Sequence, residues 1–287
     1  MKKLKTILYA LIISFVLLSG INVFAVETSP ITGVSEKTTI HVEYLYNAYG
    51  MAVSSADTTT TITTTTNEKG ETSTTTTTYT TTSVWRGGSL KVASTTGTSK
   101  NESANGANST TEFQTNYEYN DKGQLKAASG ESQTTGDRGK NDAGEELGTY
   151  ESTSEDTYIV QNGQSLKKTS VATGINYGPE GQKESDSTET TTYDYELKGG
   201  SWALVKQVDK SETKNVDGGT SLVEKTKTYT RDANGVCTGI TQAASGTLTA
   251  VGGNGGTQTY TMQNYKAEFK FDAEMGWYLS KESYDWE

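Results

Sequence analysis

The stretch that decides the fold is residues 117–125, Tyr-Glu-Tyr-Asn-Asp-Lys-Gly-Gln-Leu. Aromatic side chains two positions apart lie on the same face of a β-strand. The Asn-Asp-Lys-Gly segment is typical of a hairpin turn, in which an Asn or Asp side chain caps the turn and Gly adopts a positive φ. Leu125 then begins a returning strand that runs back alongside the aromatic pair. This stretch therefore predicts a β-hairpin with a small apolar cluster at its turn end.

The same phrase recurs along the chain, with starts at residues 44, 79, 117, 158, 193, 229 and 269. The copy at 79 is degenerate, the copy at 158 is one residue shorter, and the copy at 269 is one residue longer. The intervals of 35 to 41 residues indicate a repeat architecture. The apolar residues expected to return toward the aromatics are Leu125, Leu166, Trp202, Ile240 and Leu279.

A second set of Gly-rich or polar breaks lies between the phrases, at residues 67–70, 97–109, 136–148, 178–181, 217–219 and 252–256. Each unit is therefore predicted to be two strands, joined by a tight turn at one end and a more variable loop at the other, which gives about fourteen strands in all. No segment after residue 25 shows a helical period. The predicted fold is all-β, an antiparallel meander of about seven hairpin repeats that forms a long twisted sheet or open shell. We expect one hairpin-repeat domain over residues 26–287.

Threonine runs occupy residues 58–61, 63–66 and 74–78. Threonine favours strands, and such a run exposes no apolar face. A disordered, glycosylated stalk is the alternative interpretation. The hairpin-like break at 67–70 falls where the repeat requires one, so the pattern favours strands that are polar on both sides.

Residues 1–25 are typical of a cleavable secretory signal. Three lysines precede an apolar run over residues 7–18, and Val23-Phe24-Ala25 supplies small or short side chains for cleavage. The run is too short to cross a membrane, which takes about 20 residues. We therefore expect an exported chain, whether extracellular, at the cell surface or in the periplasm, with no membrane span after cleavage.

The composition of residues 26–287 excludes some partners. Cleavage removes three lysines and no acid, which leaves 22 basic and 35 acidic residues and a net charge of −13. Such a chain repels phosphate backbones, so no nucleic acid is expected as a partner. With Cys237 as the one cysteine, no intramolecular disulfide is available.

Two residues with reactive side chains have plainer explanations. His41 is the one histidine, and it falls in the first predicted strand among Thr and Val. A strand histidine explains it with fewer assumptions than a catalytic relay. Cys237 follows a turn glycine at an apolar position of the repeat, which favours a small buried hydrophobe over a nucleophile.

The candidate metal and sugar sites also have simpler structural explanations. The acidic segments 137–146 and 232–235 offer oxygen ligands, but turn capping explains them and neither has the spacing of a calcium loop. Three of the four tryptophans (Trp85, Trp202, Trp277 and Trp286) fall at an apolar position of the repeat, which favours hairpin packing over a sugar platform. We predict no catalytic, cofactor-binding or metal-binding residue, no cofactor and no enzyme activity.

The segments 117–125 and 229–235 resemble the YD repeat of bacterial RHS-type proteins, roughly Tyr-x-Tyr-Asp-x-x-Gly-x-Leu. The resemblance covers the hairpin tips. The period here is nearly twice that of the family, and Asp stands at the fourth position in Asp232 and Asp272 alone. Members of the family wrap long sheets into shells or present extracellular binding surfaces, so the resemblance implies a structural or binding role.

The predicted function is that of an exported structural or binding repeat protein of the bacterial envelope or extracellular space. A cell-envelope polysaccharide or another envelope protein is the expected kind of partner. Two alternatives stay open. One is a secreted enzyme acting on polysaccharide, although no carboxylate pair stands out. The other is an outer-membrane β-barrel, against which charges such as Glu155, Asp156 and Lys206 occupy both faces of their strands.

Overall fold

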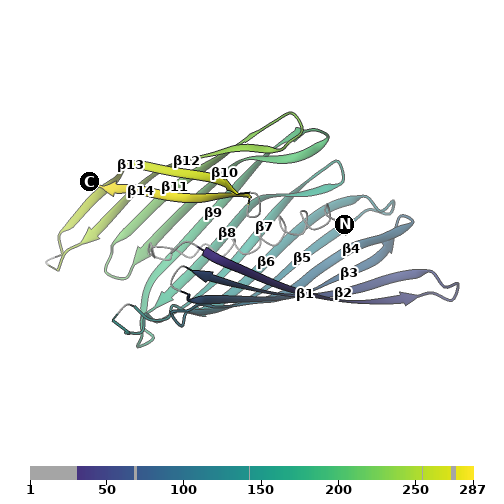
Figure 1. Ribbon diagram of the computed structural model, residues 1–287, viewed down its shortest axis with the longest axis horizontal. Coiled ribbons are helices and arrows are strands. Elements are labelled where there is room, and N and C mark those ends of the chain that lie inside the picture. The colour runs from purple at the N-terminus through teal and green to yellow at the C-terminus, as the bar shows by residue number, and fades with distance from the viewer. Residues whose placement is uncertain (1–30, 68–69, 142, 254, 273–275) are drawn as a thin grey trace.

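The computed structural model describes residues 31–287, apart from 68–69, 142, 254 and 273–275. The predicted signal peptide therefore lies outside the described residues. The described chain forms fourteen β-strands in one antiparallel sheet, in which each strand pairs with its neighbours in sequence (Figure 1). This confirms the predicted meander of seven hairpins.

The strands are β1 (Ile31–Tyr46), β2 (Ala52–Asn67), β3 (Thr72–Arg86), β4 (Ser89–Glu102), β5 (Asn108–Tyr119), β6 (Leu125–Asp137), β7 (Thr149–Gln161), β8 (Gln164–Tyr177), β9 (Lys183–Lys198), β10 (Ser201–Asn215), β11 (Thr220–Arg231), β12 (Cys237–Val251), β13 (Thr257–Asp272) and β14 (Gly276–Trp286). The threonine runs form β2 and β3, as the strand interpretation requires. Two predicted breaks are shorter than expected, because β4 continues through Gly97 and β6 continues through Gly136.

The tight turns have the predicted chemistry. In the turn after β5, the Asn120 Oδ1 atom accepts hydrogen bonds from the backbone N–H groups of Lys122 (3.1 Å) and Gln124 (2.9 Å). Gly123 has a φ of 72°, a backbone conformation that residues with a side chain rarely adopt. The turn after β11 repeats this arrangement around Asp232. The side chain at the first turn position therefore holds the turn closed.

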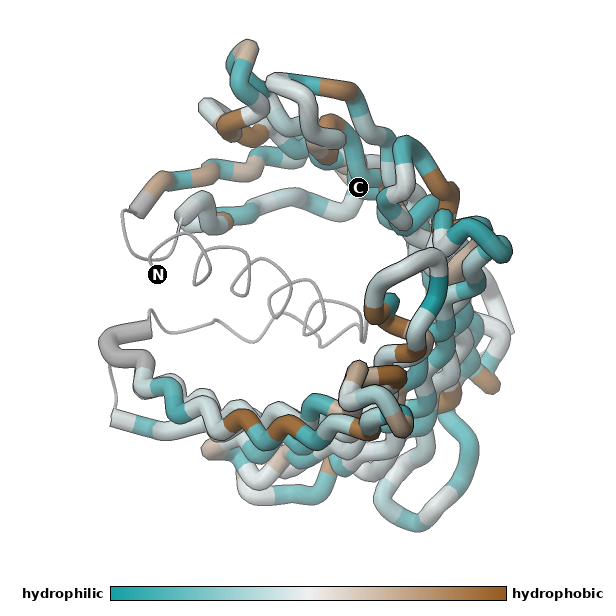
Figure 2. The backbone as a smooth tube through the Cα atoms, turned by 90° about the vertical axis from the view of Figure 1, so that its right-hand side faces the viewer, coloured by the Kyte–Doolittle hydropathy of each residue, from teal (hydrophilic) through white to brown (hydrophobic). Residues whose placement is uncertain are grey.

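Every tight-turn hairpin carries a register shift next to its aromatic phrase, at Leu45/Tyr46, Thr82/Ser83, Glu118/Tyr119, Thr157/Tyr158, Leu204/Lys206, Thr230/Arg231 and Glu268/Phe269. Such a β-bulge bends its strand and increases the local twist. Seven bulges at equivalent positions give one rim of the sheet a repeated bend. Viewed from the side, the sheet curves around a central space and does not close (Figure 2).

Most of the predicted turn-end clusters are present. Tyr229 lies opposite Ile240, and Phe269 lies opposite Leu279, on paired strands. Leu166 differs from the prediction: it lies opposite Ile159, while Tyr158 is paired with Lys167. The shorter turn of this unit and its bulge place Leu166 on the other face of the sheet.

The final hairpin leaves the plane of the sheet. Pairing between β12 and β13 covers only residues 247–251 and 257–261, and beyond this β13 pairs with β14 (Figure 1). The hairpin packs on the inner side of β11 and β12. The indole N–H of Trp277 donates to the Cys237 carbonyl oxygen at 3.2 Å, and the Trp286 ring lies over Gly246. The C-terminal hairpin thus forms a second layer over one end of the concave face.

The two faces of the sheet differ in burial. Along β9, Ser185 and Thr191 are buried on the concave side, while Asp186 and Thr188 between them and Asp194 beyond them are exposed. Pairing carries the same alternation to the neighbouring strands, so the convex face of β7 to β10 carries charges such as those of Glu155 and Lys210. The convex face of these strands therefore carries exposed charged side chains.

Candidate binding groove on the concave face

The concave face holds one long groove with a volume of about 770 Å³. Its lining comes from β2 through β12 and from β14, so both ends of the chain contribute walls to the same space. Side chains with hydroxyl or amide groups dominate the lining. On β7 three hydroxyl residues, Tyr150, Ser152 and Ser154, form a row that ends with the carboxylate of Asp156.

The most buried positions of the described chain are hydroxyl residues. Phe113 and Met262 are the two buried apolar side chains there, whereas the ten buried polar ones are all Ser or Thr. Inward side chains crowd on a concave sheet, so small residues fit best. Their hydroxyls bond across strands, as in Thr111 to Thr134 (2.9 Å) and Ser132 to Ser154 (2.8 Å). These ladders give the groove a hydroxyl floor.

Aromatic rings lie over glycines in this floor. A Cβ atom on Gly136 would stand 2.7 Å from ring atoms of Tyr150, and one on Gly97 would stand 2.7 Å from the Phe113 ring. Each ring therefore occupies the space above a glycine on the paired strand. Tyr284 and Trp286 add an edge-to-face pair, with ring centroids 6.0 Å apart, where the C-terminal hairpin bounds the groove.

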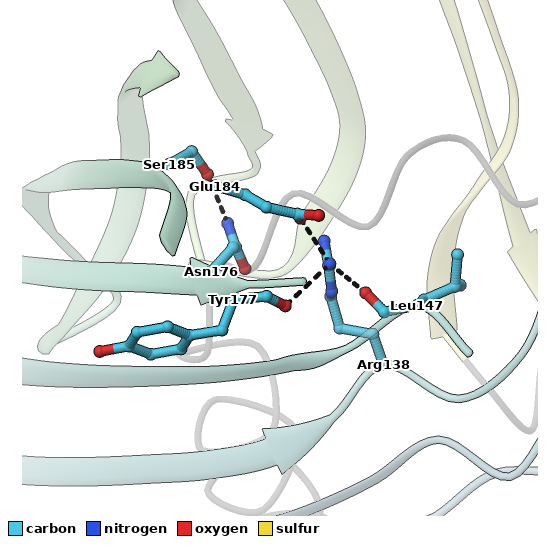
Figure 3. Close-up of polar contacts among 6 residues, drawn as sticks. All are labelled: Arg138, Leu147, Asn176, Tyr177, Glu184 and Ser185. Atoms are coloured by element: carbon cyan, nitrogen blue, oxygen red, sulfur yellow. Dashed lines mark hydrogen bonds and ion pairs between the residues drawn. The ribbon is translucent and has the colours of Figure 1, made fainter. Parts of the chain in front are cut away.

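Arg138 occupies the end of the groove near the long loops (Figure 3). One guanidinium nitrogen lies 2.6 Å from Glu184 Oε2, and it also donates to the carbonyl oxygens of Tyr177 (3.1 Å) and Leu147. The Nε atom of the same side chain is buried and has no hydrogen-bond partner among the described residues. The positive charge of Arg138 is thus neutralised by Glu184.

Asp156 and Lys167 form an ion pair on the concave face of β7 and β8. Lys167 Nζ lies 2.5 Å from Asp156 Oδ2, and both side chains are mostly buried. Burial lowers the pKa of Lys167, although the Asp156 carboxylate opposes the shift. The second carboxylate oxygen, Oδ1, is buried and has no partner in the described part of the chain. The Asp156–Lys167 pair is therefore a buried ion pair beneath the groove.

A third charged group, Glu189, lies on the concave side of β9. Burial raises the pKa of Glu189, and the Asp209 carboxylate raises it further, against a smaller opposing effect of Lys225. Asp209 accepts hydrogen bonds from Thr191 (2.8 Å) and Gln207 (2.9 Å). Glu189 pairs with Ser211, so it is a diagonal neighbour of Asp209, roughly 7 Å away by sheet geometry.

The structure gives structural roles to the candidate residues of the sequence. His41 is exposed on β1, with Nε2 at 3.2 Å from Glu43 Oε1. Cys237 is half-buried at the start of β12 rather than fully buried. Asp137 and Asp232 accept backbone N–H groups of their own turns, which is the turn-capping interpretation. Among the described residues no cluster of His, Cys, Asp and Glu could hold a metal ion.

Sequence reasoning did not single out Arg138, Asp156 or the hydroxyl floor. For Asp156 a signal was present, because Asp156 and Lys167 flank the Asn162-Gly163 turn and hairpin pairing brings such residues together. Arg138 and Glu184 are 46 positions apart, and no local pattern links them.

Comparisons with known proteins add little. No protein-family model matches the chain, and no curated protein matches it. Among solved structures, the chain is similar to a porin-like protein from Bacteroides uniformis ATCC 8492, at 16% identity over 82% of this chain and 96% of that one, with a TM-score of 0.19. A score this low carries no argument about function. In the described part of the chain, no helix has the length and apolar character needed to cross a membrane.

Proposed function

We propose that the chain is an exported binding protein that holds an extended polymer of the bacterial envelope or extracellular space along its concave face. The observation that carries this proposal is the groove itself, which runs across the sheet and is floored by hydroxyl groups. A concave surface contributed by many strands and lined by hydroxyl-bearing side chains suits an elongated ligand better than a compact one. The resemblance to YD-repeat proteins stays a prediction, and it agrees with a binding role outside the cytoplasm.

The convex face supports this proposal over an outer-membrane barrel. A strand that faces lipid needs an apolar band of about 9 to 11 residues, and charges there cost about 2 to 4 kcal/mol each near the bilayer centre. On β9 the outward positions include Asp186, Asp194 and Glu196, all exposed. Salt bridges such as Lys183 to Asp186 (2.7 Å) lie on the same side. This face is suited to water.

One pair of neighbouring side chains tests the proposal. Ser187 on β9 lines the groove, and Thr188, the next residue, is exposed on the opposite face. Ser187→Tyr would place a ring in the groove, and Thr188→Tyr would place the same ring on the convex side. In cosedimentation with cell-envelope fragments of the producing organism, we expect Ser187→Tyr to weaken binding about tenfold or more. Thr188→Tyr should bind like the wild type.

The outcome that overturns the proposal is equal binding by the two variants, or no binding by the wild-type chain. Circular dichroism and thermal unfolding of both variants check that the sheet is intact. A loss of binding in Ser187→Tyr counts only if that variant keeps the spectrum of the Thr188→Tyr control.

Glu189 and Asp209 favour a second candidate function, an enzyme that hydrolyses polysaccharide. Two carboxyl groups at roughly this separation, one with a raised pKa, are the arrangement that glycoside hydrolysis uses. The surrounding lysines give the same two acids a structural explanation. Release of reducing sugar from envelope polysaccharide by the wild type, and its loss in Glu189→Gln, would select the enzyme over the binding protein.

A further inference from the structure

We infer that the polymer held in the groove is a neutral polysaccharide, an inference that rests on the proposed binding function and names its ligand class. Three features of the groove point to this chemistry: the hydroxyl floor, the pairing of its charges, and the rings beside it.

The hydroxyl floor matches the hydrogen-bonding character of sugar. A hydroxyl group donates one hydrogen bond and accepts two. A cross-strand pair such as Ser132 and Ser154 uses one bond between its members and leaves further capacity on each oxygen. A chain of sugar units presents hydroxyls that also donate and accept, so it can bond to such a floor in many registers.

Two charged groups of the groove, Arg138 and Asp156, are compensated within the protein. Glu184 neutralises Arg138, and Lys167 neutralises Asp156, each through a close ion pair. No unpaired cation among these groups is left to hold an acidic polymer, and the net charge of −13 on residues 26–287 repels one. Glu184 and Asp156 are engaged within the protein, so these two carboxylates offer little to a basic peptide. A neutral ligand avoids both penalties.

Aromatic rings beside the floor supply flat surfaces. Tyr150 lies over Gly136, and Tyr284 and Trp286 border the groove on β14. The face of an aromatic ring carries partial negative charge, which attracts the C–H bonds on the flat side of a sugar ring. From Tyr150 to Asp156 the β7 row extends roughly 20 Å along the strand, enough for several linked sugars.

The test uses envelope material of the producing organism, separated into a protein fraction and a polysaccharide fraction. Anion exchange divides the polysaccharide into a neutral part, which is not retained, and an acidic part, which is. Binding of the wild type, Ser187→Tyr and Thr188→Tyr is measured on each fraction. We expect binding to the neutral fraction that Ser187→Tyr loses about tenfold and Thr188→Tyr keeps. Such binding should change little between low and high salt.

Each other result is decisive. Groove-dependent binding to the acidic fraction alone, or to the protein fraction alone, overturns the inference and leaves the proposed binding function standing. The absence of groove-dependent binding to every fraction overturns both.

Separate variants test whether the Tyr150 ring stacks on the ligand. Tyr150→Phe keeps the aromatic face and should keep binding to the neutral fraction within about twofold, whereas Tyr150→Ser should lose about tenfold. Tyr49→Ser removes a tyrosine that is 88% exposed in the β1–β2 turn, outside the groove, and should leave binding unchanged. Equal binding by Tyr150→Ser and Tyr49→Ser would contradict the stacking role.

Discussion

Lys225 on β11 and Glu282 on β14 are 57 positions apart in sequence, yet Lys225 Nζ lies 2.7 Å from Glu282 Oε1. The Tyr265 hydroxyl donates to the same carboxylate oxygen at 2.7 Å. Lys227 adds a cation–π contact with Phe269, at 5.9 Å from the ring centroid. These contacts hold the C-terminal hairpin against the concave face, where the hairpin bounds the groove.

Replacing Glu282 with Gln should loosen this hairpin at neutral pH. Burial alone would raise the pKa of Glu282, but the hydrogen bonds from Lys225 and Tyr265 outweigh it and hold the pKa below its usual value. The ionised carboxylate thus contributes stability above its ordinary pKa, and that stability is lost as pH falls through the lower folded-state pKa. We expect Glu282→Gln to reduce the free energy of unfolding by about 1 kcal/mol at pH 7.

Denaturant unfolding of Glu282→Gln across pH checks this. The difference from wild type should shrink toward zero in acid and should also fall in high salt. A difference that is the same at every pH would mean that packing, not charge, holds the hairpin.

Glu189 should behave in the opposite way. Its pKa is raised by burial and by Asp209, so the ionised form costs stability at neutral pH. Stability from this group is fully present below its ordinary pKa and is lost as pH rises through the folded-state value. Glu189→Gln should therefore raise the melting temperature at pH 7, on the order of 2 °C, and the gain should vanish near pH 4. A lower melting temperature at pH 7 would show that Glu189 is a stabilising partner of Lys225.

Gly136 should not tolerate even a methyl group. A Cβ atom there would lie 2.5 Å from the Asn108 carbonyl oxygen and 2.7 Å from the Tyr150 ring. Gly136→Ala should lower the free energy of unfolding by about 1 to 3 kcal/mol. Gly253 is the matched control, because nothing lies within 4 Å of its Cβ position, and Gly253→Ala should stay within about 0.5 kcal/mol of wild type. Equal effects in denaturant unfolding would mean that Tyr150 does not cover Gly136.

The hairpins could be predicted from sequence because each carries its own local signal. Asn120 and Gly123 specify a turn, and aromatics two positions apart specify the face of the strand. The bulges could not be predicted in this way. The register shift between Leu204 and Lys206 inserts one unpaired residue into β10, and the residue types around it do not mark its position. The curvature, and with it the groove, depends on such residues.

The groove could not be predicted from the sequence either, because the hydroxyl residues that line it are common in strands. Ser132 and Ser154 look like surface residues in the sequence, since hydroxyl residues are usually exposed. Only the curvature of the sheet brings them together in a floor. Arg138 and Glu184 meet for the same reason, across 46 positions.

The polar convex face leads to a prediction about solubility. Residues 26–287 should remain in aqueous buffer without detergent, and in detergent phase separation they should stay in the aqueous phase. The exposed charges Asp186, Asp194 and Glu196 on β9 are the reason. Partition into the detergent phase would favour the outer-membrane barrel instead.

The central claim, that ligand occupies the concave face, can be measured with one thiol. Cys237 is the single cysteine, so Cys237→Ser gives a background in which Ser187→Cys or Thr188→Cys is the only thiol. The rate of alkylation of each is measured with and without envelope fragments. We expect the fragments to slow alkylation about tenfold or more at position 187 and to leave position 188 unchanged. Equal protection of both positions, or protection at 188 alone, would contradict it.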